Sequence, residues 1–224
     1  MTSENQLEFI PHAFGLELFY PPLGVPDNAM REIYLELAGR CRFTEFRQLG
    51  EGQGARYAEG NNRHLTIVHD RFVYRDEFTQ STFSGFLEDM MAVLPVVRSK
   101  LSMPVWLHCK VMIELLLPYQ GEKTAIEFLA NRCLRPVVGN LPLFSRPSSG
   151  LGIRLVFPPT DKKHSTFHLR IEPYYRDPKM FFIENRAQFY DPVVETEQMR
   201  PLLTEAYDFV KAEAGPFILA CESS

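Results

Sequence analysis

The sequence has few cysteines, and they are not spaced for metal binding. The four cysteines, Cys41, Cys109, Cys133 and Cys221, are scattered along the chain and form no C-x-x-C pair. Zinc sites use closely spaced cysteines, and small secreted domains use dense disulfide frameworks. The spacing therefore argues against both and favours reduced, mostly buried thiols, which are typical of a cytoplasmic protein.

Long apolar runs are also absent. No run approaches the ~20 residues that a transmembrane helix needs, and the strongest one, Val111 to Leu117, is interrupted by Glu114. The N-terminus carries Glu4 and Glu8, where a secretory signal would carry positive charge. We therefore expect a soluble protein that acts in the cytoplasm and does not associate with membranes.

The motifs of the common catalytic classes are missing. The sequence contains neither a G-x-S-x-G nucleophile elbow nor a Walker loop. His64 and His69 are five residues apart, so a strand would point them to opposite faces. Cys109 is adjacent to His108, and the same alternation prevents them from acting as a nucleophile and its base. We predict no catalytic residue, no metal and no cofactor.

A glycine-rich stretch from Leu49 to Gly54 resembles a phosphate-binding loop at first sight. A dinucleotide fingerprint must open a long helix, whereas Arg56-Tyr57-Ala58 and a further turn follow here. We interpret this stretch as the turn of a β-hairpin.

Excess positive charge is missing as well, since the net charge is -4 at pH 7. This balance predicts no general attraction to nucleic acid or to an anionic membrane. Arginine outnumbers lysine, however, and Arg40, Arg42 and Arg47 lie close together in the sequence. Nucleic-acid binding through these arginines is therefore kept as a second alternative function.

A strand pattern dominates the second half of the sequence. The run from Phe167 to Ile171 and the run from Phe181 to Arg186 alternate apolar with polar residues, and Asp177-Pro178 between them is a turn signal. Such alternation on both sides of a turn predicts antiparallel strands with one buried face. Residues 63–78 repeat the pattern more weakly.

Helical patterns follow each of these strand regions. We predict an α+β fold, a largely antiparallel sheet with helices mainly on one face. A single domain covers residues 1–224, and its approximate halves, 15–102 and 105–220, form an internal pseudo-repeat of strand, helix, strands and helix. Pro95 lies within the helical pattern that ends the first half, and it should kink or split that helix. The second half opens with a long strand, Val105 to Leu117.

If the helices cover one face of the sheet, polar and charged side chains gather on the other. The candidate binding residues on that second face are Trp106, His108, Lys110, Met112 and Glu114 from the long strand, and His168, Arg170, Glu172, Glu184 and Arg186 from the hairpin. An aromatic and sulfur-bearing surface with interleaved charge suits an amphipathic ligand or a protein partner. A purely solvated face, with charges that pair across strands, would have the same pattern.

The leading hypothesis is a non-enzymatic binding protein that engages a protein partner or an amphipathic small molecule. Trp106 would be the anchor of an interface, because tryptophan is common among binding hot spots, unless it belongs to the core. The alternative is a small hydrolase or isomerase in which His108 works with Glu114 or Glu172 as acid and base. Since His108 and Glu114 are ~20 Å apart along a strand, such a pair needs a residue from another strand.

Two resemblances accompany these patterns. The Tyr20-Pro21-Pro22 opening, the long strand after the midpoint and the closing helix before Pro216-Phe217-Ile218 resemble an uncharacterised bacterial family of similar length. The order of elements is also similar to that of GyrI-like ligand-sensing domains. That resemblance implies an amphipathic ligand bound around a buried glutamate, for which Glu114 is the matching residue.

Overall fold

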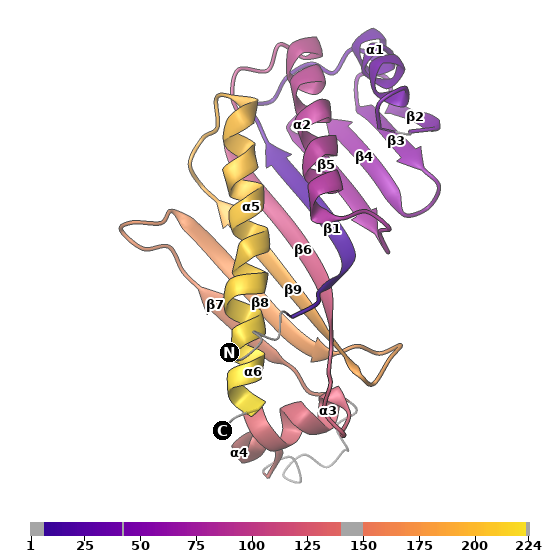
Figure 1. The fold of residues 1–224 in the computed structure, drawn as a ribbon. Coiled ribbons are helices and arrows are strands. Elements are labelled where there is room, and N and C mark those ends of the chain that lie inside the picture. The colour runs from indigo at the N-terminus through magenta and orange to yellow at the C-terminus, as the bar shows by residue number, and fades with distance from the viewer. Residues whose placement is uncertain (1–6, 42, 140–149, 223–224) are drawn as a thin grey trace, which may run out of the picture.

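The computed structural model describes residues 7–41, 43–139 and 150–222, and its strands form one nine-stranded antiparallel sheet. The order across the sheet is β2-β3-β4-β5-β1-β6-β9-β8-β7 (Figure 1). The strands are β1 (Ile10–Phe19), β2 (Glu45–Gly50), β3 (Gly54–Glu59), β4 (Arg63–Val68), β5 (Arg71–Glu77), β6 (His108–Pro118), β7 (Ile153–Phe157), β8 (Ser165–Pro173) and β9 (Met180–Phe189). The predicted α+β class with an antiparallel sheet is confirmed.

The long helices lie together on one side of this sheet. Figure 1 shows α1 (Asp27–Ala38), α2 (Phe83–Lys100) and α5 (Met199–Phe209) in front of the strands. A 3-10 turn, η3 (Thr196–Gln198), precedes α5, and a π turn, η4 (Val210–Ala214), joins it to α6 (Gly215–Glu222). The short α3 (Ala125–Phe128), η1 (Leu129–Cys133) and α4 (Arg135–Val138) lie beyond one end of the sheet. We call the helix-bearing side the covered face and the opposite side the open face.

The two turns predicted from the sequence form hairpins. Strands β8 and β9 pair antiparallel, with Ile171 opposite Ile183, and both of these side chains are fully buried. Strands β2 and β3 pair through the glycine-rich turn. Gly52 and Gly54 adopt positive φ angles of 65° and 108° there, a conformation that costs glycine nothing. The hairpin interpretation of residues 49–54 is therefore confirmed.

Helix α2 shows how local sequence and burial combine. Thr82 caps its N-terminus by accepting a hydrogen bond from the Gly85 amide at 3.2 Å. The helix continues through Pro95 instead of splitting there. The proline ring is exposed, while Met90 and Val97 on the opposite side are fully buried.

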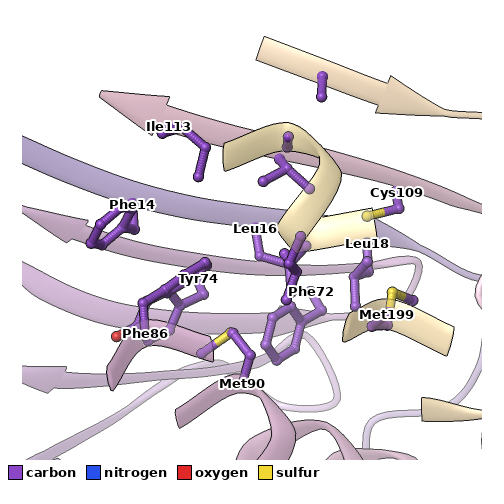
Figure 2. Close-up of a cluster of buried hydrophobic side chains, with 14 of the residues drawn as sticks. Phe14, Leu16, Leu18, Phe72, Tyr74, Phe86, Met90, Cys109, Ile113 and Met199 are labelled. Atoms are coloured by element: carbon purple, nitrogen blue, oxygen red, sulfur yellow. The ribbon is translucent and has the colours of Figure 1, made fainter. Parts of the chain in front are cut away.

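A single cluster of buried apolar side chains extends through both predicted halves. Figure 2 shows its centre, where side chains of the sheet meet those of the helices. The labelled residues there are Phe14, Leu16 and Leu18 of β1, Phe72 and Tyr74 of β5, Cys109 and Ile113 of β6, Phe86 and Met90 of α2, and Met199 of α5. Cys109 is buried on the covered face, as its position in the alternation predicts.

The two halves meet at the centre of the sheet. Strand β1 pairs with β6, and the last strand of each half, β5 or β9, flanks that pair. The four strands nearest the centre therefore come from both halves of the chain. That the halves form an internal pseudo-repeat stays a prediction. Within the described ranges, no helix is long and apolar enough to span a bilayer.

Candidate functional site on the open face of the sheet

The open face collects most of the polar residues that the sequence indicates. Alternation along β6 places His108, Lys110, Met112 and Glu114 there, each only partly buried, whereas the residue that follows each of them is buried. The pairing register brings β8 and β9 alongside, with Arg186 opposite Met112 and opposite His168. Glu172 and Arg170 lie further along the same face of β8.

Trp106 is the exception, and its predicted position on this face is wrong. Strand β6 begins at His108 rather than at Val105, so the alternation does not extend back to residue 106. Trp106 forms an isolated bridge with Val193 and is 1% exposed. Its ring packs edge-on against Tyr20 and Phe72, at centroid distances of 5.7 and 6.2 Å. Trp106 is therefore a core residue, and it cannot anchor a surface interface.

Glu184 is the centre of an ion cluster on the open face. Its carboxylate is 2.7 Å from Nε of Arg186 and 3.2 Å from Nη2 of Arg170. The Glu184 residue is 5% exposed, so two arginines compensate for its desolvation. Glu114 lies directly opposite Glu184 in the register, which places a second carboxyl group beside the first.

The second carboxyl group has a shifted pKa. Burial raises the pKa of Glu114 to about 7, and the negative charge of Glu184 adds to the rise. Arg170 and Arg186 act in the opposite direction, while a hydrogen bond between the two carboxyl groups favours the protonated form. Near neutral pH, Glu114 therefore exists partly as a carboxylic acid that can donate a hydrogen bond.

A cavity of about 520 Å³ lies beside this carboxyl pair and extends across β5, β1, β6 and β9. It is lined by His12, Ala13, Glu17, Arg75, Glu77, Phe78, Lys110, Val111, Met112, Glu114, Arg186, Ala187 and Gln188. This volume is within the range of small-molecule sites. Of the residues predicted from the sequence, the cavity brings together Lys110, Met112, Glu114 and Arg186.

Arg75 lies across the floor of the cavity, and Gly15 makes room for it. The two residues are paired between β5 and β1. A Cβ atom at position 15 would overlap Nη1 of Arg75 and would lie 3.1 Å from its Cζ. The guanidinium group therefore rests on bare backbone above β1. No carboxylate of the described residues lies within 4.0 Å of it.

An aromatic group closes one end of the cavity around His12. The imidazole makes edge contacts with Phe78, Tyr174 and Phe182, at centroid distances of 5.1, 5.3 and 5.7 Å. Burial lowers the pKa of His12, and the nearby charge of Arg176 lowers it further. His12 is therefore a neutral imidazole at pH 7, with an apolar wall around it.

A second aromatic group surrounds His108, at the other end of the same face. The His108 ring is stacked between Phe19 and Tyr190, at centroid distances of 5.2 and 5.3 Å. Lys110 lies 4.7 Å from the centre of the Phe19 ring and 3.7 Å from Glu17. Burial lowers the pKa of His108, and Lys110 contributes to the same direction.

The proposed acid–base pairs with His108 are not assembled. Glu114 is six residues away on the same strand, or about 20 Å. Glu172 is opposite Phe182, which is opposite Leu116, so it lies about 26 Å along the sheet from His108. Proton transfer needs hydrogen-bond reach, and neither pair has it. His168 is also outside the cavity and faces a smaller one, of about 280 Å³, beside Arg154 and Arg170.

The predicted arginine cluster is divided between the two faces. Phe46 contacts Tyr34 of α1 at a centroid distance of 5.5 Å, so its neighbour Arg47 projects to the open face. Arg40, just after α1, pairs with Glu36 at 3.9 Å on the helical side. Arg42 lies outside the described residues. The described members therefore form no common phosphate-binding surface.

Sequence reasoning missed the contribution of the first half of the chain. Arg75 and Glu77 alternate with buried Phe72, Tyr74 and Asp76 along β5, and this pattern already predicts that they share the open face. Gly15 within a strand was a further signal, because such glycines often mark the close approach of another group. What the sequence did not indicate is that β1 pairs with β6 and that β5 lies on the other side of β1.

Metal ligation finds no support in the described ranges, which contain no group of three or more His, Cys, Asp or Glu side chains that could hold an ion.

The fold and the site together define an α+β protein with a polar cavity on the open face of an antiparallel sheet. Comparison with models of known protein families finds no match for this chain, and comparison with curated proteins finds no significant match either.

Proposed function

We propose that this protein is a non-enzymatic binding protein that takes up an amphipathic small molecule in the open-face cavity. The observation that carries the proposal is the cavity itself, of about 520 Å³, with polar groups along the floor and an aromatic wall at one end. Sites for small molecules combine a concave shape and apolar walls with a few placed polar groups. Arg75 and Glu114 would orient the polar end of the ligand, and Phe78 with Met112 would contact its apolar part.

A small molecule is favoured over a protein partner for two reasons. The surface that contains the candidate residues is hollowed, whereas a stable protein interface needs about 800 Å² of complementary surface on each partner. Trp106, the expected anchor of such an interface, is in the core. No other tryptophan is present in the sequence.

The proposal is tested by blocking the cavity. Anilinonaphthalene sulfonate is an amphipathic dye that reports apolar binding sites by its fluorescence. We expect the folded protein to bind it and the Met112→Trp variant, whose larger side chain would fill the cavity floor, to bind it about tenfold more weakly. Val156→Trp is the matched control, because Val156 is 52% exposed on edge strand β7 and does not line the cavity.

Equal binding by wild type and Met112→Trp would contradict the proposal, since the dye would then be bound elsewhere. Absence of binding to the wild-type protein would contradict it as well. Thermal unfolding of both tryptophan variants establishes that they remain folded.

Acid–base catalysis is a second candidate, and a different residue pair from the predicted one favours it. The cavity contains neutral His12 and the carboxyl group of Glu114, two groups suited to act as base and acid near neutral pH. A ligand purified with the protein would then be converted by the wild type but not by Glu114→Gln. Mass spectrometry of the recovered ligand, unchanged after incubation with the wild type, would exclude this candidate and leave binding.

A further inference from the structure

We infer that the ligand of the open-face cavity carries a carboxylate, and that the guanidinium group of Arg75, held flat on Gly15, binds it. This inference rests on the proposed binding function and assigns the chemical class of the ligand. It follows from the state of Arg75, from the role of Gly15 and from the charges around the cavity.

Arg75 differs from its neighbours in having no carboxylate partner among the described residues. Arg71 contacts Glu17 at 3.2 Å, and Arg170 and Arg186 both contact Glu184. Around Arg75, by contrast, the described residues place no carboxylate within ion-pair distance. A guanidinium group offers its N–H donors as a planar fork that fits a carboxylate through two parallel hydrogen bonds. Arg75 is therefore a cation in a cavity with its donors available to a ligand.

Gly15 fixes where that cation lies. Any larger residue would place a Cβ atom against Nη1 of Arg75 and 3.2 Å from Cδ, so the side chain would have to lift away from the strand. With glycine, the guanidinium group crosses from β5 over β1 towards Met112, the residue opposite Gly15 on β6. The positive charge is thereby located over β1, one of the four strands across which the cavity extends.

The surrounding charges favour a single negative charge on the ligand. Glu17, Glu77 and Glu114 all line the cavity, and Glu17 is shared between Arg71 and Lys110. A phosphate dianion would face these carboxylates, and among the described residues that line the cavity Arg75 is the arginine or lysine without an ion pair. A carboxylate monoanion matches that one cation. The carboxyl group of Glu114, when protonated, adds a donor for one of its oxygens.

The test compares three naphthyl probes that differ only in their polar end: naphthylacetate, the neutral naphthylacetamide and naphthyl phosphate. Calorimetric titrations use the wild type, Arg75→Gln, Gly15→Ala and Arg154→Gln. The last variant is the matched control, since Arg154 is on the open face outside this cavity. Thermal unfolding of each variant monitors folding, and Arg75→Gln carries the test alone if Gly15→Ala does not fold.

We expect the wild type to bind naphthylacetate about tenfold more tightly than the amide, as one charge-assisted bidentate contact allows. Arg75→Gln should abolish this preference and leave amide binding unchanged. Gly15→Ala should weaken acetate binding while retaining the charge, and Arg154→Gln should resemble the wild type.

Three results would overturn the inference. These are binding of the amide as tight as that of the acetate, a preference for the acetate that persists in Arg75→Gln, and tighter binding of naphthyl phosphate than of the acetate. A failure of the proposed binding function would give a different result, because Met112→Trp would then leave the binding of all three probes unaffected. Loss of all binding in Met112→Trp, together with an unchanged preference in Arg75→Gln, would retain the cavity and reject the carboxylate site.

Discussion

The covered face and the open face of the same sheet both carry charged residues, but these charges are compensated to different extents. On the covered face, Arg63 is 3.1 Å from Asp89 of α2, 3.5 Å from Asp76 and 3.2 Å from Glu59. Thr79 also donates a hydrogen bond to Asp76 at 2.7 Å. This cluster joins α2 to β4 and β5, and every charge in it has a partner.

On the open face the signs of the charges are reversed, and not every charge is compensated by a described residue. Here a carboxylate, Glu184, is central, and Arg170 and Arg186 flank it. Arg75 remains without a carboxylate from the described residues, and Glu114 is beside a carboxylate of the same sign. Charge on the covered face therefore serves stability, whereas under the proposed function part of the charge on the open face is available for a ligand.

The largest expected effect is the loss of stability when Trp106, which lies in the core rather than on the open face, is truncated. Trp106→Ala should lower the free energy of unfolding by about 3–5 kcal/mol, because removal of a buried aromatic side chain leaves a large cavity. Urea unfolding measures the change. Tyr175→Ala is the control, since Tyr175 is 78% exposed, and it should cost about 0.5 kcal/mol or less. Similarly small losses in the free energy of unfolding for both variants would show that Trp106 is not a core residue.

The next effect compares the two ion clusters directly. The side chain of Arg63 is 13% exposed, so Arg63→Met should lower the free energy of unfolding by about 3 kcal/mol, because it removes the ion pair of the buried Asp76 carboxylate. The side chain of Arg170 is 40% exposed, and Glu184 retains Arg186 without it. Arg170→Ser should therefore cost less than about 1 kcal/mol.

Chemical denaturation of the two arginine variants at the same pH and ionic strength provides this comparison. Equal losses of stability would show that the open-face cluster is structural in the same sense as the covered one. Arg186→Ser, in which Glu184 retains Arg170, should behave like Arg170→Ser.

The smallest effect depends on pH and concerns Glu114. Its pKa is raised from 4.5 to about 7, so the folded state retains a proton that the unfolded state has released between these values. The wild type therefore loses stability as the pH rises through this window. Glu114→Gln cannot ionise, and its stability relative to the wild type should rise from pH 5 to pH 8.5 by about 1–2 kcal/mol, a value reduced for partial exposure.

The groups that face Glu114 set the sign of this effect. Glu184 from β9 raises the pKa, Arg170 and Arg186 lower it, and burial has the largest influence. Lys110 of the same strand and the cavity residues His12, Arg75 and Glu77 lie nearby. Urea unfolding across the pH range measures the difference between variant and wild type. A difference that stays constant with pH would show that Glu114 titrates normally.

The local features of this protein could be predicted from its sequence. Period-two alternation predicted the β8–β9 hairpin and the antiparallel sheet, and it placed Lys110, Met112, Glu114 and Arg186 on one face. It also assigned Cys109 to the core. These predictions succeeded because side chains of a regular strand alternate between two faces, whichever strands are paired beside it.

The contacts that these residues make depend on the tertiary structure. Trp106 turned to the core because the regular strand begins only at His108, and its bridge to Val193 is a contact that no local pattern predicts. Gly15 with Arg75, and Glu114 with Glu184, are likewise brought together by strand pairing. Since pairing joins segments that are distant in the chain, the cavity is a property of the strand order rather than of any one stretch of sequence.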